Sequence, residues 1–331
     1  MTDYFKKNKI AIVGCGYWGT NIAKTLISLK IYNFFCHDNN SENLKTIYKR
    51  YNTIIISKKF EEILHNNSIK VVFICVPTSL HYYYAKKLLE ANKHVFVEKP
   101  VSTNPSHIRS LIKIAKNKKL KLMSGYLYLY NKYIRYIKKD ILNKNFLGKV
   151  QYLEFNRKNY GPIRKDASSL WDLGAHDISI LRYFYKEKFR NIKYIETSIN
   201  QNKISDIYNL NFNVKKIPIN INVSWLYPEK IRQINIIGKK KILHFDELNT
   251  NEPIKIYKIF QKYPSTKEIA NKFFNPQQKI TMEKPYVPKF SKFSPLKEEI
   301  FVFLDCIRKN KKILTDGEFA LLISKDLKKF T

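Results

Sequence analysis

The feature that most constrains how this chain can fold is a glycine-rich turn, Gly14-Cys-Gly-Tyr-Trp-Gly19, between an apolar run and a helical stretch. The apolar run, Ile10–Gly14, is typical of a buried strand, and Trp18–Leu29 is typical of a helix. Glycine at the three spaced positions permits a tight turn, a close backbone approach to a ligand, and close packing of the helix on the strand. The helix start offers unpaired N–H groups to an anion. The segment therefore predicts a strand, turn and helix that bind the diphosphate of a dinucleotide.

Strands and helices alternate over about the first 120 residues, and the predicted strands are mostly apolar, as in parallel sheets covered on both faces. The predicted strands are Ile10–Gly14, Phe34–Asp38, Val71–Val76 and His94–Glu98. The predicted helices are Trp18–Leu29, Ser41–Tyr51, His81–Ala91 and Pro105–Lys116, the last with Asn104 as its N-cap. This order predicts an α/β fold with a doubly wound parallel sheet in residues 1–124.

The pattern changes after about residue 125, where apolar and polar residues alternate strictly over Tyr208–Val214 and Ile217–Val223. Such alternation predicts strands with one buried and one wet face, hence an open, largely antiparallel sheet. Helices are predicted at Asn131–Leu142, Asp172–Tyr185, Leu296–Arg308 and Gly317–Lys329. The proline-containing stretch Tyr263–Ser294 is expected to be a long loop. Residues 125–331 are therefore expected to form a second, α+β domain.

The net charge of +34 raises the possibility of nucleic-acid binding, but only nine of the 61 basic residues are arginine. The lysines are spread over the whole chain, so we expect no nucleic-acid partner and instead a positive field that attracts small anions. No apolar run approaches the roughly 20 residues of a membrane helix, and we expect no membrane partner. Four cysteines without a CxxC pair are typical of a reduced, cytoplasmic protein.

Asp38 ends the second predicted strand, where an acidic side chain can accept hydrogen bonds from the ribose of a bound adenosine. A carboxylate at this position would repel a 2′-phosphate, so NAD is favoured over NADP. The alternative is a glycine turn followed by an unrelated aspartate. The histidines and cysteines show no ligand spacing, and no metal is expected.

Two stretches, Phe73–His81 and Lys93–Pro100, are similar to the Gfo/Idh/MocA oxidoreductases, and the likeness extends to the closing segment Pro295–Glu299. The resemblance implies a Rossmann domain followed by an α+β domain whose sheet often forms a dimer face, with the active site between the domains. It also implies that the Pro77–His81 loop touches the cofactor, that Glu98 lies by the nicotinamide ribose, and that Lys99 is catalytic. The expected cofactor-binding residues are Gly14, Cys15, Gly16, Tyr17, Trp18, Gly19, Asp38, Val76, Pro77, Thr78, His81, Glu98 and Lys99.

The position of Lys99 supports this role independently, because it follows a predicted parallel strand, at the edge where α/β sheets bind ligands. Pro100 keeps Lys99 out of helical geometry. Oxidation of an alcohol requires a base that takes the hydroxyl proton, and a partly desolvated lysine beside a cationic nicotinamide can serve as one. The alternative is that Lys99 is one more surface lysine.

Asp172 and His176 are four residues apart and share one face of a predicted helix. The resemblance gives His176 a role beside the reacting hydroxyl, as a proton relay or orienting donor, and makes Asp172 its polar partner at the helix start. Alternatively, Asp172 is an N-cap and His176 a satisfied buried histidine. Ser179 occupies a position where many relatives carry an aspartate, which argues against a polyol-dehydrogenase site.

Four further stretches, Tyr130-Asn131, Arg157–Asp166, Trp171–Ser179 and Val223–Arg232, resemble the branch of the family that acts on nucleotide-linked sugars in surface-polysaccharide synthesis. Members of that branch typically oxidise the sugar 3-hydroxyl or reduce the 3-ketone. Arginine and lysine side chains, among them Lys230, suit a pyrophosphate or carboxylate, and asparagines suit sugar hydroxyls. The expected substrate-binding residues are Tyr126, Asn131, Arg157, Asn159, Arg164, Asp166 and His176. The alternative is that these are ordinary surface and strand residues.

The leading hypothesis is an NAD-dependent dehydrogenase of a nucleotide-linked sugar, assembled as a homo-oligomer (dimer or tetramer) through the second sheet. Two alternatives remain: a dehydrogenase of a free sugar or an inositol-like polyol, and a non-catalytic NAD-binding sensor. A basic nucleic-acid binder is a third, for which affinity would fall steeply with added salt.

Overall fold

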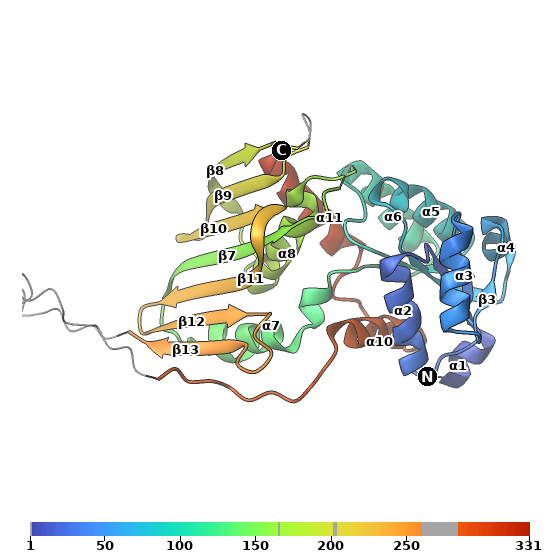
Figure 1. The fold of residues 1–331 in the computed structure, drawn as a ribbon, viewed down its shortest axis with the longest axis horizontal. Coiled ribbons are helices and arrows are strands. Elements are labelled where there is room, and N and C mark those ends of the chain that lie inside the picture. Colours follow the sequence, from blue (N-terminus) through green and yellow to red (C-terminus); the bar gives the residue numbers. More distant parts are fainter. Residues whose placement is uncertain (1, 165, 201–203, 260–283) are drawn as a thin grey trace, which may run out of the picture.

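The computed structural model describes residues 2–164, 166–200, 204–259 and 284–331. Two sheets lie side by side, each with its own helices (Figure 1). The helices of the first sheet are at the right of that view, and the second sheet is at the left. This arrangement confirms the predicted pairing of a doubly wound domain with an α+β domain.

The first sheet has six strands in the order β3-β2-β1-β4-β5-β6, and every neighbouring pair is parallel. Its strands are β1 (Lys9–Val13), β2 (Phe35–His37), β3 (Ile55–Ile56), β4 (Ile69–Ile74), β5 (His94–Val97) and β6 (Leu122–Ser124). The four predicted strands are confirmed to within two residues. The sequence pattern missed β3 and β6 because runs of two or three residues carry no periodicity.

Helices cover both faces of this sheet, as crossover connections between parallel strands require. They are α1 (Thr2–Lys7), α2 (Tyr17–Ser28), α3 (Ser41–Arg50), α4 (Phe60–His65), α5 (Thr78–Glu90) and α6 (Pro105–Asn117). The side chain of Asn104 caps α6 by accepting from the Ser106 N–H, as its sequence position predicts. The four predicted helices correspond to α2, α3, α5 and α6.

The second sheet has seven strands in the order β13-β12-β11-β7-β10-β9-β8. They are β7 (Val150–Tyr160), β8 (Phe189–Thr197), β9 (Ile207–Val214), β10 (Ile217–Ser224), β11 (Leu226–Gly238), β12 (Lys241–Asp246) and β13 (Ile254–Lys258). Only β7 and β10 pair in parallel; the other pairs are antiparallel, which confirms the predicted, largely antiparallel sheet. The apolar positions of β9 and β10 are buried and the asparagines between them are not.

The helical elements of the second half are η1 (Leu127–Tyr130), α7 (Lys132–Tyr136), η2 (Ile137–Leu142), η3 (Leu170–Gly174), α8 (Ala175–Phe184), α10 (Pro295–Arg308), α11 (Gly317–Leu327) and η4 (Lys328–Phe330). Helix α10 returns to the first sheet, where the Phe303 ring lies 5.6 Å from Phe73 and 5.7 Å from Phe96. Helix α10 thus packs on the first domain although it lies in the second half of the sequence. The predicted domain boundary after residue 124 stays a prediction.

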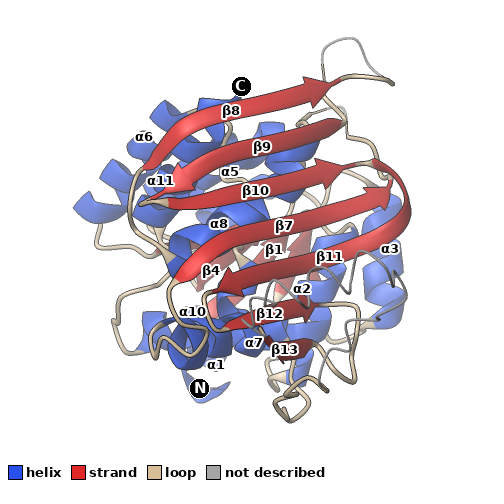
Figure 2. Ribbon diagram, turned by 90° about the vertical axis from the view of Figure 1, so that its left-hand side faces the viewer, coloured by secondary structure: helices blue, strands red, loops and turns tan. Residues whose placement is uncertain are grey.

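One face of the second sheet is packed on helices and the other is uncovered in the described part of the chain (Figure 2). Amide side chains on β7, β9 and β10 form a hydrogen-bonded network across three strands, which we call the amide ladder. Its members are Asn156, Asn209, Asn211, Asn220 and Asn222. Oligomerisation through this sheet stays a prediction.

The expected loop at Tyr263–Ser294 lies mostly outside the described residues. Residues 284–294 form no helix or strand beyond one bridge between Tyr286 and Ile256. Within the described chain, no helix combines the length and apolar character that crossing a bilayer demands.

Candidate active site

The glycine turn joins β1 to α2 at the carboxyl edge of the first sheet. Gly14 has a φ of +92°, and a Cβ there would lie 2.6 Å from the backbone carbon of Cys75. A Cβ on Gly19 would lie 1.9 Å from the carbonyl oxygen of Gly14. These two glycines are therefore required by a left-handed conformation and by tight packing of the turn on its neighbours.

Gly16 differs from them, because a Cβ at this position would have no protein atom within 4 Å. It is the N-cap of α2 and contributes no side-chain cap, so the first N–H groups of the helix keep no side-chain acceptor. Open space in front of an uncapped helix start suits an anionic group. The residues present therefore fit the diphosphate of a dinucleotide.

A cavity of about 440 Å³ opens beside this turn. Its lining is Val13, Gly14, Gly16, His37, Asp38, Asn39, Asn40, Asn43, Cys75, Val76, Pro77, Leu80 and Tyr84. Five of the predicted cofactor residues thus line the same cavity: Gly14, Gly16, Asp38, Val76 and Pro77. The structure adds Asn39, Asn40 and Asn43, which the sequence analysis did not assign.

The Asp38 carboxylate holds the glycine turn in place. Its Oδ2 accepts from the Cys15 N–H at 2.7 Å and from the Asn43 side chain at 3.0 Å, and its Oδ1 accepts from the Asn40 N–H at 2.7 Å. The backbone of Cys15 therefore contributes to the site indirectly, by connecting the turn to the end of β2.

His81 connects the predicted cofactor loop to the segment that carries Lys99. Its Nδ1 lies 2.7 Å from the carbonyl oxygen of Pro100 and its Nε2 lies 2.8 Å from that of Val76. Burial lowers the pKa of His81, although the two carbonyl contacts oppose this shift. The side chain is buried and does not line the cavity beside the glycine turn, so it positions the two loops.

A second cavity, of about 550 Å³, lies between the start of α2, the end of β5 and the inner side of the second sheet. Its lining is Tyr17, Trp18, Lys99, Tyr128, Arg157, Asn159, Tyr160, Gly161, Pro162, Arg164, Asp172, Leu173, His176, Pro228, Lys230 and Arg232. Tyr17 and Trp18 lie within the glycine turn, directly after Gly16 of the first cavity, so the two cavities adjoin at the start of α2. All three predicted catalytic residues line this second cavity.

Lys99 is fixed by Asp172. Its Nζ donates to the Asp172 carbonyl oxygen at 2.7 Å and to the carboxylate Oδ1 at 3.1 Å, with the two side chains only 8% and 11% exposed. The same carboxylate pairs with Arg164 at 3.1 Å and accepts from the Trp225 indole at 3.2 Å. Burial would raise the pKa of Asp172, but the charges of Lys99 and Arg164 outweigh it and lower that pKa. The peptide bond between Lys99 and Pro100 is cis.

His176 begins the second turn of the helical segment that carries Asp172, and its ring packs edge-on against Tyr128 at 5.0 Å. Burial first, and then the surrounding cations, hold the pKa of His176 well below its ordinary value, so the imidazole is neutral near neutral pH. Its Nδ1 is buried and has no hydrogen-bond partner among the described residues. The neutral ring also lines the second cavity, where an imidazole nitrogen can donate to or accept from a substrate hydroxyl.

Glu98 lies behind Lys99 and outside both cavities. Burial raises the pKa of Glu98 to about 7, despite the opposing charge of Lys99. Its Oε2 accepts from the Lys99 N–H at 3.3 Å. The carboxyl group therefore titrates near neutral pH.

Arg157 is occupied by protein partners. It donates from Nε and Nη2 to Asp177 at 3.0 and 2.8 Å, and from Nη1 to the Tyr128 hydroxyl at 2.6 Å. The side chains of Arg157 and Asp177 are 5% and 1% exposed. This guanidinium shapes the cavity wall and has its charge balanced already.

Three predicted substrate residues lie away from the cavity. Tyr126 is buried, with its ring 5.4 Å from Phe319, and Asn131 is buried as the N-cap of α7. Asp166 accepts from the Thr78 N–H at 3.0 Å, so both residues serve to join the second domain to the start of α5. Asn159 and Arg164 do line the cavity, together with Lys230.

Tyr128 and Arg232 are among the residues lining this cavity that the sequence analysis did not assign. Tyr128 bridges Arg157 and Glu247 through its hydroxyl group. Arg232 lies two residues after Lys230 on β11, and this alternation is the signal that could have placed it on the same face.

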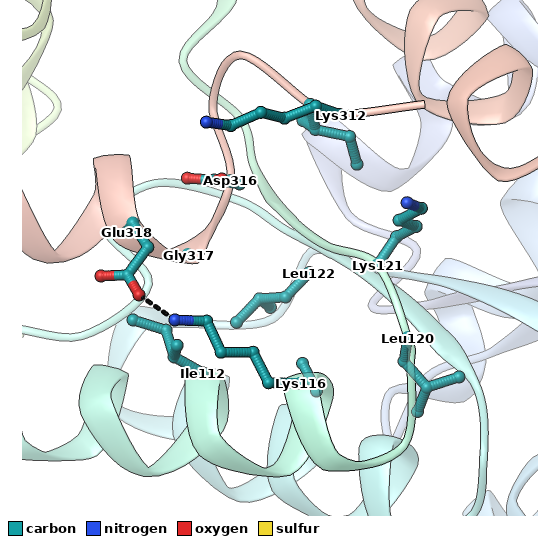
Figure 3. Close-up of a pocket in the computed structure, with 11 residues that line it drawn as sticks. Ile112, Lys116, Leu120, Lys121, Leu122, Lys312, Asp316, Gly317 and Glu318 are labelled. Atoms are coloured by element: carbon teal, nitrogen blue, oxygen red, sulfur yellow. Dashed lines mark hydrogen bonds and ion pairs between the residues drawn. The ribbon is translucent and has the colours of Figure 1, made fainter. Parts of the chain in front are cut away.

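A smaller hollow of about 150 Å³ lies between α6, β6 and the start of α11 (Figure 3). An ion pair of 2.6 Å joins Lys116 to Glu318 on its wall. It contains none of the predicted catalytic, cofactor or substrate residues.

The sheet order, the uncapped helix at a glycine turn and the cavity between the two sheets define a two-domain dinucleotide-binding Rossmann protein. Residues 8–126 match the GFO_IDH_MocA family model, described as an oxidoreductase family with an NAD-binding Rossmann fold. Over these residues the chain is therefore similar to the Gfo/Idh/MocA oxidoreductases, the family that its sequence resembles.

Curated relatives include the myo-inositol 2-dehydrogenase of Thermotoga maritima, 23% identical over 190 residues, which are 56% of this chain and 57% of that protein. The glucose-6-phosphate 3-dehydrogenase of Bacillus subtilis is 24% identical over 196 residues, 55% of each protein. The chain thus spans a little over half the length of these two curated relatives.

Among solved structures, the UDP-N-acetylglucosamine 3-dehydrogenase GnnA from Acidithiobacillus ferrooxidans is similar with a TM-score of 0.77 at 19% identity. The likeness covers 97% of this chain and 95% of that chain. At this identity it shows that the whole fold is shared.

Proposed function

We propose that this protein is an NAD-dependent oxidoreductase that transfers a hydride between nicotinamide and a sugar hydroxyl or ketone. The observation that carries the proposal is the contact of the Lys99 ammonium with Asp172 inside a cavity that adjoins the glycine turn. His176 lines the same cavity, so a base, its anionic partner and a neutral imidazole face one enclosed space.

The glycine turn, the start of α2 and Asp38 would hold the dinucleotide, whose nicotinamide supplies the hydride acceptor when bound. We propose NAD over NADP because the Asp38 carboxylate would repel a 2′-phosphate. Titration with NADH and NADPH tests this preference, and equal affinities would contradict it.

The proton chemistry follows from the side chains. As the sugar carbon loses its hydride to the bound nicotinamide, the hydroxyl proton passes to the Lys99 amine, which must first have given up its own proton, and the alcohol becomes a ketone. The resulting ammonium is stabilised by the carbonyl oxygen and the carboxylate of Asp172, which already accept from it. His176 orients the hydroxyl group by a hydrogen bond.

We propose the 3-position of a nucleotide-linked sugar in polysaccharide biosynthesis as the substrate site. The size and basic lining of the cavity support this choice, as does the fold shared with a UDP-sugar 3-dehydrogenase. We also propose a cytoplasmic homo-oligomer joined through the second sheet.

The experiment is a turnover assay with NAD and a panel of UDP- and dTDP-linked sugars, alongside myo-inositol and glucose. We expect nicotinamide reduction with a nucleotide-linked sugar, and a loss of about 1,000-fold or more in Lys99→Met. Lys24→Met, on the exposed side of α2, is the matched control. An active Lys99→Met enzyme, or no turnover and no bound reduced cofactor, would overturn the proposal.

A further inference from the structure

The strand β11 carries an irregularity at the cavity. Its register with β7 runs from Leu226 opposite Tyr160 to Ile231 opposite Lys158, so residues 227–230 stand against Asn159 alone. This bulge brings Pro228 and Lys230 to the cavity wall beside Asn159. Bulges of this kind redirect side chains, and here the redirected side chain is a lysine.

Arg232 follows the bulge, and its hydrogen-bond partners among the described residues are neutral oxygen atoms. Its Nη1 donates to the carbonyl oxygens of Lys158 at 2.8 Å and Ile231 at 2.7 Å, and its Nη2 donates to the Asn159 side chain. In the described part of the chain, no carboxylate lies within ion-pair distance of this guanidinium. Arg157, Arg164 and Arg182, by contrast, each pair with an aspartate.

The charge of the cavity is correspondingly unbalanced. Among the described residues, its lining carries the cations Lys99, Arg157, Arg164, Lys230 and Arg232 and the single carboxylate Asp172. Asp177 balances Arg157 from behind the wall. Burial and the nearby charge of Arg157 lower the pKa of Arg232, although the more distant carboxylates of Asp177 and Glu247 oppose this shift.

A half-buried cation without an anionic partner is stabilised by an anionic ligand. We propose that Arg232 and Lys230 bind a phosphate group of the substrate, with Asn159 holding the Arg232 guanidinium in position. This inference rests on the proposed function and names the part of the substrate that the second domain recognises. A hexose phosphate and a nucleoside diphosphate sugar both supply this chemistry. Arg157 takes no part, because its donors are already committed to Asp177 and Tyr128.

The test is calorimetric titration of the full-length protein saturated with NADH, so that the glycine turn is already occupied. The probes are UDP, glucose 6-phosphate, and glucose as the neutral control. We expect Arg232→Gln to lower the affinity for the tighter-binding phosphate ligand by about 10-fold or more, and Lys230→Gln to lower it by a smaller factor. Lys216→Gln, at an exposed lysine in the turn between β9 and β10, is expected to change nothing.

Tighter binding of UDP identifies a nucleoside diphosphate as the source, tighter binding of glucose 6-phosphate identifies a hexose phosphate, and either supports the subsite. Since Lys230 is exposed, Lys230→Gln tests the subsite even if Arg232→Gln fails to fold. Unchanged phosphate affinity in Lys230→Gln and in folded Arg232→Gln would overturn the inference, as would wild-type protein that binds glucose as tightly as either phosphate ligand. If phosphate affinity is unchanged but the proteins oxidise a neutral sugar, the subsite is wrong and the oxidoreductase proposal still holds. If the two variants lose phosphate affinity but the wild type oxidises no sugar, the subsite is supported and the oxidoreductase proposal is not.

Discussion

Asp172 is the residue on which the contacts of the candidate site converge. It accepts from Lys99 through both its carbonyl and its carboxylate, and the carboxylate also contacts Arg164 and Trp225. The indole of Trp225 is buried, so it fixes the direction in which the carboxylate points. The position of the Lys99 amine therefore depends on one aspartate.

We expect Asp172→Asn to lower kcat/KM by about 10- to 100-fold, because a small displacement of the base misaligns proton transfer. The affinity for NADH is expected to stay the same, since Asp172 lies outside the cofactor cavity. Steady-state kinetics and NADH titration check this, with Asp140→Asn on the surface of η2 as the control. Wild-type kcat/KM in Asp172→Asn would contradict the positioning role.

Glu98 makes the stability of the fold depend on pH. Its pKa is raised from 4.5 to about 7, so the folded protein holds a proton that the unfolded chain releases above about pH 4.5. The stability that the protonated carboxyl group contributes is full at low pH and is lost as pH rises through 7. Glu98→Gln resembles the protonated form at every pH.

We therefore expect Glu98→Gln to gain stability relative to the wild type between about pH 5 and about pH 8, by on the order of 3 kcal/mol. Urea unfolding at the two pH values, without added dinucleotide, measures the difference. Glu61→Gln, an exposed glutamate on α4, controls for a general charge effect. A stability difference that does not change with pH would contradict the raised pKa.

At the scale of elements, the turn between β1 and α2 contains glycines of two kinds: those required by packing and the one that faces the proposed ligand. Gly19→Ala is expected to cost about 2 kcal/mol, because its Cβ would collide with the backbone of the turn. Gly16→Ala is expected to leave the melting temperature nearly unchanged, because its Cβ would meet no protein atom. It is expected to weaken NADH binding, because the Cβ would occupy the space where we propose that the diphosphate binds. Thermal unfolding and NADH titration distinguish the two variants. A Gly16→Ala protein with wild-type affinity would contradict diphosphate binding at this turn.

The elements that could be predicted from sequence were those with long, regular patterns. The alternating β9 and β10 were found because every second residue is buried, and β1 with α2 because the glycines separate them. The parallel pairing of β7 with β10 and the bulge in β11 could not be predicted, since both depend on partners far away in the chain.

The candidate site was predictable where motifs lie at strand ends or on one helix face, as for Lys99, Asp172 and His176. It was not predictable where a side chain is buried against a residue that is distant in the sequence. Tyr126 is buried against Phe319, which comes almost 200 residues later, and nothing near Tyr126 in the sequence indicates this. Which residues bind substrate in solution stays a prediction.

At the scale of the whole molecule, the uncovered face of the second sheet is where we expect a second copy of the chain to bind. We expect sedimentation to give about twice the 39.4 kDa of one chain or a higher multiple of it, since the family resemblance implies that this sheet forms a dimer face. The double substitution Asn220→Lys and Asn222→Lys on the amide ladder is expected to give monomers. Asn117→Lys at the end of α6 is the control, and a monomeric wild type would contradict the prediction.

The central claim is that Lys99 and the glycine turn bring one sugar carbon and one nicotinamide together. The most direct measurement is the transfer of deuterium from carbon 3 of a labelled nucleotide-linked sugar to NAD, followed by mass spectrometry of the coenzyme. The account predicts label in the reduced coenzyme with the wild type and almost none with Lys99→Met. Reduced coenzyme without label, or equal labelling by both proteins, would contradict it.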